Sequence, residues 1–405
     1  MVLKKTNISI SFLFLFATIY VFYAVRNMQR VSWAIDDPIV QNQGPFLQLI
    51  GMIVLITAYC IVIGLEEFPK SRLTVFFLFW AMVVGNRIFL LDGAEGFNFK
   101  QTIEITLQQA ILPLFTFIFF FLLLYKYKEK IIYFYWLIIV GWILTLTYFF
   151  IIDYSASQSV LGEDIQVATS YHIFYFLPFC LCLNNKFLKW LGCGIIILTQ
   201  LMSLKRGSVI GCAVGIVVYN MIQSLYITRS EHTLRKIILT IFTLGVVIVA
   251  FVVFDNIHNE GLLWERMNDI SEDEGSGRSE AMDYMWKKIP EIPIDKLILG
   301  YGYLGSVEFS PFELTAHNDF LEVLFDYGLI GLCLYLWFYV LIFKKIKRLI
   351  KQKSEFAAPL AAAFAIFCFM SMISHIIIYP HFVTYSILLG TMEGMTYEQE
   401  LIERV

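Results

Sequence analysis

Long apolar stretches, separated by short polar turns, cover almost the whole of this chain. A helix crosses the hydrocarbon core of a bilayer with about 20 mostly apolar residues, and about twelve stretches approach that length. The candidate spans are residues 8–25, 46–65, 73–91, 105–125, 131–152, 167–183, 188–204, 207–227, 236–254, 319–343, 357–378 and 381–395. Because three of these stretches are short, the pattern predicts an all-α polytopic membrane protein with about 12 transmembrane helices, in a range of about 10 to 12.

A long polar segment, residues 255–317, interrupts the apolar pattern. It is too long for a plain connection between helices, and it carries acids, bases and glycines. The pattern therefore predicts an N-terminal transmembrane bundle over residues 1–254, with about nine spans. A large loop with short helices follows over residues 255–317, and C-terminal transmembrane helices occupy residues 318–405.

Lysine and arginine residues indicate the orientation, because they concentrate in the cytoplasmic segments of membrane proteins. When the N-terminus is placed inside, most of them fall in cytoplasmic segments, with the largest group at residues 344–353. This bias predicts that both termini are cytoplasmic and that the loop 255–317 is extracytoplasmic.

The composition agrees with a membrane protein. Hydrophobic residues make up 59% of the chain and charged residues 16%, whereas an average soluble domain is about 25% charged. A net charge of −3 does not indicate a nucleic-acid partner. All seven cysteines lie in apolar stretches, so they are interpreted as small hydrophobic residues, and neither a disulfide nor a metal site is expected.

Within the polar segment, residues 278–289 are predicted to form a short helix that ends before Pro290. Met282, Met285, Trp286 and Ile289 recur at helical spacing and give this helix one apolar face. Such a helix is a candidate for lying on the membrane surface.

Gly300, Gly302 and Gly305 match the pattern G-x-G-x-x-G. A dinucleotide site is rejected, because no strand-helix-strand context surrounds the motif. The glycines are instead expected to supply turns and close backbone approach. The acidic run 272–274 is interpreted as a solvated loop rather than a cation site, since metal sites need convergent oxygen ligands.

A helix is predicted to begin directly after the polar segment. Asn318 is a good N-cap, and Asp319 suits the dipole of a first helical turn. Asp319, Glu322 and Asp326 share one helix face, and carboxylates at this depth should face protein or water. Gly328 and Gly331, one turn apart, permit close helix contact.

These motifs together resemble a known family. The run from Gly277-Arg278 through Leu299-Gly300-Tyr301-Gly302, followed by His317-Asn318, Leu321-Glu322, Gly328 and Gly331, resembles the signature of the O-antigen polymerase and O-antigen ligase superfamily. Leu204-Lys205-Arg206-Gly207, at a predicted helix junction, is similar to that family's upstream arginine motif. The plan is also similar, with a large periplasmic loop before the last helices.

The resemblance implies a metal-independent glycosyltransferase with a GT-C-like membrane fold and no cofactor, whose donor is an oligosaccharide on undecaprenyl diphosphate. At matching positions it implies that Arg206 and Arg278 lie near the diphosphate and His317 at the acceptor. The chemistry suits these groups. Histidine can take a proton from an attacking sugar hydroxyl near neutral pH, and arginine binds phosphate oxygens through paired hydrogen bonds.

Other residues are candidates for substrate binding, each with a structural alternative such as a helix cap, a helix-end anchor or an interfacial polar group. Arg266 is a spare cation for phosphate or sugar, and His375 flanks the last external turn. The candidate catalytic residues are His317, Arg206 and Arg278, and the candidate substrate-binding residues are Arg266, Asn318, Asp319, Glu322, His375 and Lys205.

The sequence thus predicts a polymerase that joins lipid-linked repeat units into O-antigen, capsule or exopolysaccharide at the outer face of the bacterial cytoplasmic membrane. Its expected partners are the bilayer, the lipid-linked substrate, a chain-length regulator and a flippase. One alternative is a ligase of the same superfamily, which passes finished glycan to lipid A core or protein. Another is a flippase or transporter, although transporters tend to show internal repeats and charges near the midplane, and neither is visible in this sequence.

Overall fold

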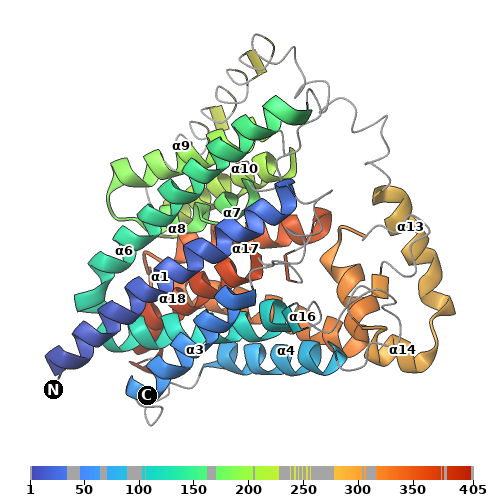
Figure 1. The fold of residues 1–405 in the computed structure, drawn as a ribbon, viewed down its shortest axis with the longest axis horizontal. Helices are drawn as coiled ribbons and strands as arrows, with labels where there is room; N and C mark the ends of the chain where they lie inside the picture. The colour runs from blue at the N-terminus through green and yellow to red at the C-terminus, as the bar shows by residue number, and fades with distance from the viewer. Residues whose placement is uncertain are drawn as a thin grey trace. The chain divides into compact units, whose positions relative to one another are not determined.

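The computed structural model describes residues 2–33, 46–63, 71–88, 103–161 except 105, 170–203, 206–227, 278–302, 305–306, 316–377 except 375, and 381–402, with a few residues between 238 and 256. All regular elements in these ranges are helical (Figure 1). The chain forms two compact units. Unit 1 comprises residues 1–85, 97–203 and 379–405, and unit 2 comprises residues 86–96 and 204–378. The three-region division drawn from the sequence stays a prediction.

Unit 1 is built from apolar helices. They are α1 (Val2–Trp33), α3 (Phe46–Ile63), α4 (Arg72–Ile88), η1 (Leu107–Ile111), α6 (Leu112–Leu161), α7 (Ser170–Phe174), α8 (Leu177–Cys182), α9 (Lys186–Met202) and α18 (His381–Ile402). Small residues let α18 approach α6 closely: a Cβ at Gly390 would lie 2.5 Å from the Phe117 carbonyl oxygen. Small residues at such contacts are typical of helices that pack within a membrane.

Helix α6 reverses its direction at Tyr127, whose backbone is non-helical. The ring centroids of Phe120 and Tyr135 are 5.9 Å apart, whereas residues 120 and 135 of a straight helix would be separated by about 22 Å. The reversal therefore divides α6 into two arms that run back along each other. This agrees with the two separate apolar stretches, 105–125 and 131–152, that the sequence predicts.

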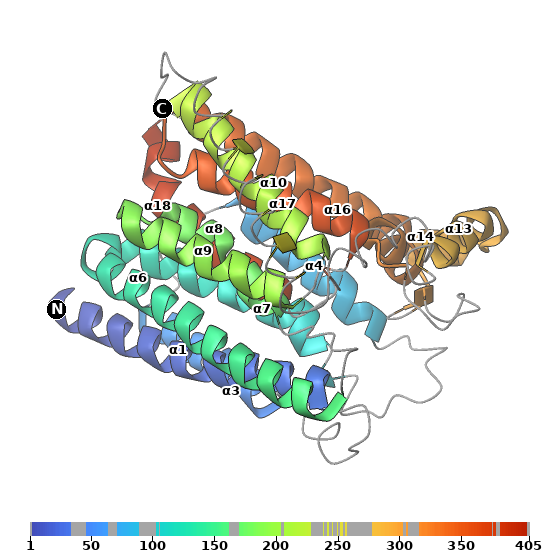
Figure 2. The same ribbon diagram turned by 90° about the horizontal axis from the view of Figure 1, so that it is seen from above.

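Unit 2 contains α10 (Arg206–Ile222), η2 (Gln223–Ile227), α13 (Arg278–Lys288), η3 (Ile289–Glu291), α14 (Ile294–Leu299), α16 (Asp319–Lys351) and α17 (Ala357–Ile373). Helix α17 contacts both α10 and α16, and the three run beside one another in Figure 2. Helices α16 and α17 are antiparallel, because Tyr335 contacts Ser371 while Tyr339, one turn later, contacts Phe364.

Helix α16 bends sharply at Gly328, which has a positive φ of 65°. Before the bend, residues 319–327 are buried except for the half-buried Phe320. The Phe320 ring lies 5.6 Å from Tyr339, so the first segment folds back along the second. The predicted span 319–343 is therefore not one straight helix. Residues 329–351, about 34 Å long, match the hydrocarbon core better.

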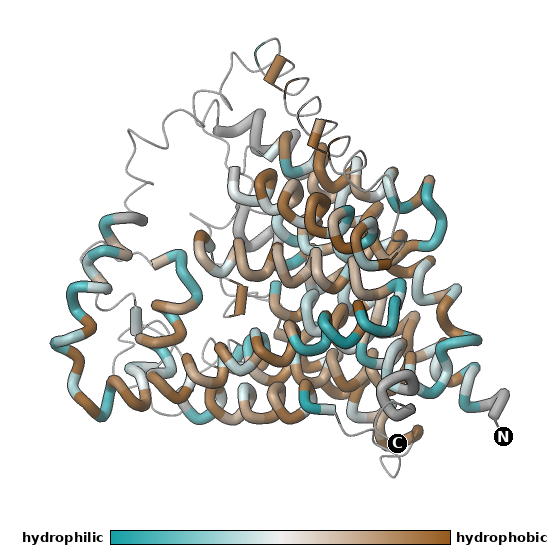
Figure 3. Tube along the Cα trace, turned by 180° about the vertical axis from the view of Figure 1, so that it is seen from behind, coloured by the Kyte–Doolittle hydropathy of each residue, from teal (hydrophilic) through white to brown (hydrophobic). Residues whose placement is uncertain are grey.

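Five helices among the described residues are long and apolar enough to cross a membrane. They are Lys5–Arg26, Phe46–Ile63, Leu107–Ile152, Gly207–Ile227 and Asp319–Lys351. Shorter apolar helices lie at Arg72–Asn86, Ser170–Cys182 and Ala357–Ile373. In Figure 3 brown turns dominate these helices, whereas teal turns alternate with brown along α13 and α14. The chain is thus an all-α membrane protein, while the predicted number of spans stays a prediction. The predicted span 236–254 lies almost wholly outside the described residues.

Candidate active site

The turn at His317 and Asn318 is the centre of the candidate site. Asn318 caps α16, and its side-chain oxygen accepts hydrogen bonds from the Phe320 and Leu321 amides at 3.0 and 3.2 Å. The N-cap predicted from the sequence is therefore confirmed. His317 has a positive φ of 49°, a left-handed conformation that non-glycine residues adopt rarely and that clusters at functional sites. His317 is half-buried.

Helix α13 covers this turn. The predicted helix over 278–289 is confirmed within a residue, since α13 ends at Lys288. Met285 belongs to a buried cluster with Ala316, Leu321 and Phe325, and Met282 and Ile289 pack against it. The predicted apolar face thus lies against the start of α16. Trp286 differs, with 57% of its surface exposed. Whether α13 lies on a membrane surface stays a prediction.

Asn318 joins three elements of unit 2. Its amide nitrogen donates to the Met372 carbonyl oxygen of α17 at 3.4 Å and to Met282 Sδ of α13 at 3.9 Å. The same residue begins α16. The turn that carries His317 is therefore held where α13, α16 and the last turn of α17 meet.

Arg206 and Arg278 are each the first residue of a helix, α10 and α13. Arg278 lies four residues before Met282, on the same helix face. Four residues rise about 6 Å, so α13 begins about one helical turn from the residue that contacts Asn318. Arg206 begins the helix that packs along α17. The side chains of both arginines lie outside the described part of the structure.

The glycine motif forms a close backbone contact with the bend of α16. The Tyr301 and Gly302 amides donate to the Phe325 and Asp326 carbonyl oxygens at 2.8 and 2.9 Å. A Cβ at Gly300 would lie 2.3 Å from the Asp326 carbonyl oxygen. Gly300 and Gly302 also have positive φ. The predicted role of these glycines, turns and close backbone approach, is therefore confirmed.

The three carboxylates near the start of α16 are fully buried. Asp319, Glu322 and Asp326 each have 0% of their surface exposed. Asp319 accepts from the Ile376 amide at 3.0 Å and from the Tyr335 hydroxyl at 3.0 Å, and Asp326 accepts from the Ser306 amide at 3.1 Å. Asp319 and Asp326 therefore bind protein groups, as the sequence predicts for carboxylates at this depth.

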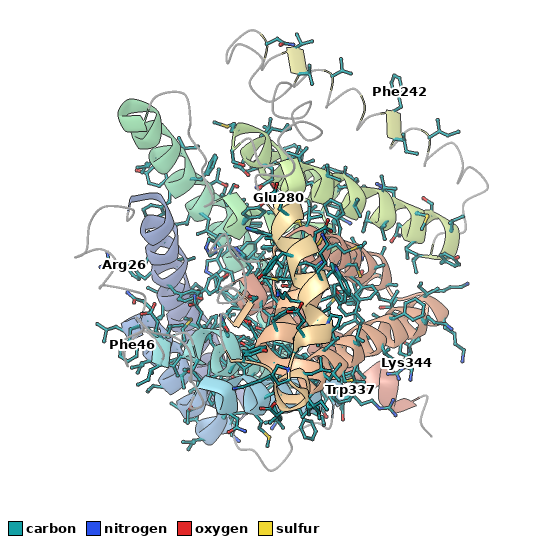
Figure 4. The ribbon with its side chains drawn as sticks, turned by 90° about the vertical axis from the view of Figure 1, so that its right-hand side faces the viewer. Arg26, Phe46, Phe242, Glu280, Trp337 and Lys344 are labelled. Carbon is teal, nitrogen blue, oxygen red and sulfur yellow. The ribbon has the colours of Figure 1, made fainter. Side chains whose placement is uncertain are left out.

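The outer face of α13 is polar. Glu280, labelled in Figure 4, is exposed in its first turn. At the other end Lys288 Nζ lies 2.6 Å from Glu291 Oε2, and this carboxylate raises the pKa of Lys288. The pair is exposed, so it contributes little to stability.

Three candidates, Lys205, Arg266 and His375, and the acidic run 272–274 lie outside the described residues. Within the described part of the chain, no group of three or more His, Cys, Asp or Glu side chains is placed to hold a metal ion.

The sequence does not predict two residues near the site, Tyr335 and Ser371. Tyr335 contacts Asp319 directly, and Ser371 contacts Tyr335. No spacing rule relates residues 319 and 335, because they meet only through the bend at Gly328.

These features define a polytopic α-helical membrane protein with a candidate site at a half-buried turn between its polar segment and its last helices. Residues 191–336 match the family model described as O-Antigen ligase. The resemblance to the O-antigen polymerase and ligase superfamily is therefore confirmed, and the match supports a membrane enzyme of polymerase or ligase type. A comparison with curated proteins gives no match.

Asn318 offers a test of this geometry. Replacing it by Ala should lower the free energy of unfolding by about 1 kcal/mol, because the N-cap is lost. Asn318→Asp keeps the capping oxygen and loses only the two long contacts of the amide nitrogen, to the Met372 carbonyl oxygen and Met282 Sδ, so its loss should be smaller. Denaturant titration in detergent micelles measures both. Equal losses would show that the cap does not stabilise α16.

Proposed function

We propose that this protein polymerises oligosaccharide repeat units carried on undecaprenyl diphosphate, at the outer face of the bacterial cytoplasmic membrane, with a GT-C-like arrangement of helices and no metal. The observation that carries the proposal is the His317–Asn318 turn. A histidine in a left-handed conformation lies between α13, which begins with Arg278, and α17, which contacts α10, the helix that begins with Arg206. The two helices that begin with Arg206 and Arg278 thus belong to the same unit as His317.

The reaction is a glycosyl transfer. The hydroxyl of an acceptor sugar attacks the anomeric carbon of the donor glycan. A carbon–oxygen bond forms there as the bond from that carbon to the diphosphate oxygen breaks, and the hydroxyl proton passes to the His317 imidazole. The electron pair of the broken bond leaves on the lipid diphosphate, whose charge Arg206 and Arg278 stabilise.

The predicted topology supports this assignment. In that topology α10 begins, and α17 ends, on the extracytoplasmic side, where the polar segment 255–317 also lies. In this topology Arg206, at the start of α10, lies at the same depth in the membrane as the Met372 carbonyl group, to which Asn318 donates a hydrogen bond. A site at this level suits a donor whose tail stays in lipid and whose sugar lies in water.

The alternative within the same family is a ligase that transfers finished glycan to lipid A core or protein. It is kept because the matching family model is described by ligase activity. The two functions differ in what a deletion strain accumulates. Loss of a polymerase leaves single repeat units on the final acceptor, whereas loss of a ligase leaves long glycan on the carrier lipid. If the deletion strain still makes a ladder of long glycan, and this glycan remains attached to the carrier lipid, the polymerase assignment is refuted.

The arginines give a graded prediction. Arg206→Ala and Arg278→Ala should each lower the rate of polymer growth about 100- to 1000-fold, the usual effect of removing one group that stabilises developing charge. Lysine at either position should restore part of the rate, since it keeps the charge but not the paired hydrogen bonds. Gel analysis of glycan from complemented deletion strains measures these rates.

Lys287→Ala is the matched control for Arg278, because Lys287 is an exposed cation at the other end of the same helix. This control should give normal polymer at normal membrane abundance. If Arg278→Ala and Lys287→Ala reduce polymer equally, α13 does not supply a specific diphosphate ligand.

A further inference from the structure

A buried hydrogen-bond network begins one residue beyond the candidate turn. Tyr335 Oη donates to Asp319 Oδ2 at 3.0 Å, and Ser371 Oγ lies 2.7 Å from the same tyrosine oxygen. A phenol has one proton and a carboxylate only accepts, so Ser371 donates to Tyr335. Asp319 also accepts from the Ile376 amide at 3.0 Å. We call these groups, Asp319, Tyr335, Ser371 and the Ile376 amide, the Asp319 network.

The Asp319 network exists because α16 folds back on itself. Asp319 and Tyr335 are 16 residues apart on one helix, and a straight helix would separate them by about 24 Å. The bend at Gly328 brings them into contact instead. The Tyr335 hydroxyl therefore ties the first turn of α16 to its membrane-crossing part, and Ser371 ties both to α17.

Asp319 is placed to act on the turn rather than on a substrate. Its side chain has no exposed surface, and both carboxylate oxygens accept hydrogen bonds from protein groups. Its neighbour Asn318 donates to the Met372 carbonyl. Two consecutive residues are thus fixed to the end of α17, and the half-buried His317 directly precedes them.

We infer that Tyr335 and Ser371 are positioning residues that act through Asp319 to hold the His317 imidazole at the acceptor. This inference rests on the proposed function and changes the role of Asp319 from substrate binding to positioning. A left-handed histidine keeps one orientation only when its surroundings fix it. The network supplies that constraint from two helices at once. A displacement of about 1 Å in such a site is enough to lower a rate about 100-fold.

The test compares Tyr335→Phe with Tyr135→Phe in the purified, reconstituted protein. Both variants remove one buried tyrosine hydroxyl: Tyr135 Oη lies 2.8 Å from Thr391 Oγ1 in unit 1, whereas Tyr335 Oη contacts Asp319, Ser371 and Tyr339. Both should lower the unfolding temperature, and Tyr335→Phe should lower it more, because it also removes a hydrogen-bond donor from the buried Asp319 carboxylate. Tyr335→Phe should lower kcat about 10- to 100-fold while KM for the lipid-linked donor changes less than about threefold. Tyr135→Phe should leave kcat within about twofold of the parent.

A double variant separates positioning from general loss of stability. If the two residues act as one unit, Asp319→Asn with Tyr335→Phe should be no slower than Asp319→Asn alone. A double variant that is slower than Asp319→Asn alone would overturn the inference. Equal kcat values for Tyr335→Phe and Tyr135→Phe would overturn it as well.

Hydrogen exchange gives a readout that needs no activity. The peptide that contains residues 316–322 should exchange about tenfold faster in Tyr335→Phe than in Tyr135→Phe, because the network no longer holds the first turn of α16. Equal exchange refutes the positioning role even if the parent protein polymerises glycan. If the parent protein makes no polymer but the peptide still exchanges faster in Tyr335→Phe than in Tyr135→Phe, the proposed function is refuted. The structural role of the Asp319 network is then still supported.

Discussion

Replacing His317 by Asn is expected to abolish polymer growth while the protein still inserts and folds. Asparagine, like histidine, tolerates the left-handed conformation that residue 317 adopts, so the turn should keep its shape. It cannot take a proton from the acceptor hydroxyl. Loss of a general base lowers a rate about 100- to 10,000-fold. Glycan from a deletion strain that carries the variant should show single repeat units and no ladder.

His317→Gly is the control for the backbone at this position, since glycine adopts positive φ without strain. It should also make no polymer, and its unfolding temperature should be close to that of the parent. A normal ladder from His317→Asn would show that the imidazole is not the base. A ladder from His317→Gly that external imidazole restores would support the assignment further.

Replacing Gly328 by Ala is expected to cause a large loss of stability for a single methyl addition. The new Cβ would lie 2.3 Å from the Ile298 carbonyl oxygen, and Gly328 has a positive φ of 65°. A non-glycine residue is strained at this positive φ even where space is available. The atom that the new Cβ would meet belongs to the backbone, so it cannot move aside as a flexible side chain could. We expect a loss of about 3 kcal/mol in the free energy of unfolding, measured by denaturant titration in detergent.

Polymer growth should fall with this variant as well, because the bend at Gly328 brings Asp319 beside Tyr335. Gly141→Ala is the matched control, since nothing lies within 4 Å of its added Cβ. Alanine is favoured over glycine inside a helix by about 0.5–1 kcal/mol, so this control should be as stable as the parent or slightly more stable. Similar stability of the two variants would mean that α16 does not bend at Gly328.

Local features of the fold were predictable from the sequence. Capping chemistry and helical spacing are local properties, so the sequence correctly predicts the Asn318 cap and, within a residue, the limits of α13. The pair of apolar stretches on either side of Tyr127 likewise predicted the two arms of α6. Hydropathy reports which residues avoid water, and these elements follow from it directly.

Contacts between helices were harder to predict from the sequence. The apolar face of α13 was visible, but periodicity does not name what covers it, and the structure places it on α16. The sequence predicts close helix contact at Gly328, yet no local feature distinguishes a straight helix from one that folds back there. The Asp319 network depends on that fold. The arginine and histidine candidates came from the family resemblance, and the contacts of the two arginine side chains stay predictions.

The central claim is that this chain alone joins lipid-linked repeat units. The most direct measurement supplies the purified protein, reconstituted in liposomes, with labelled undecaprenyl-diphosphate-linked repeat units and no other enzyme. A ladder of labelled glycan on the carrier lipid, lost in His317→Asn, is the result expected of a polymerase. Repeat units that cross the bilayer unchanged, with no product longer than one unit, would identify a transporter and contradict the account.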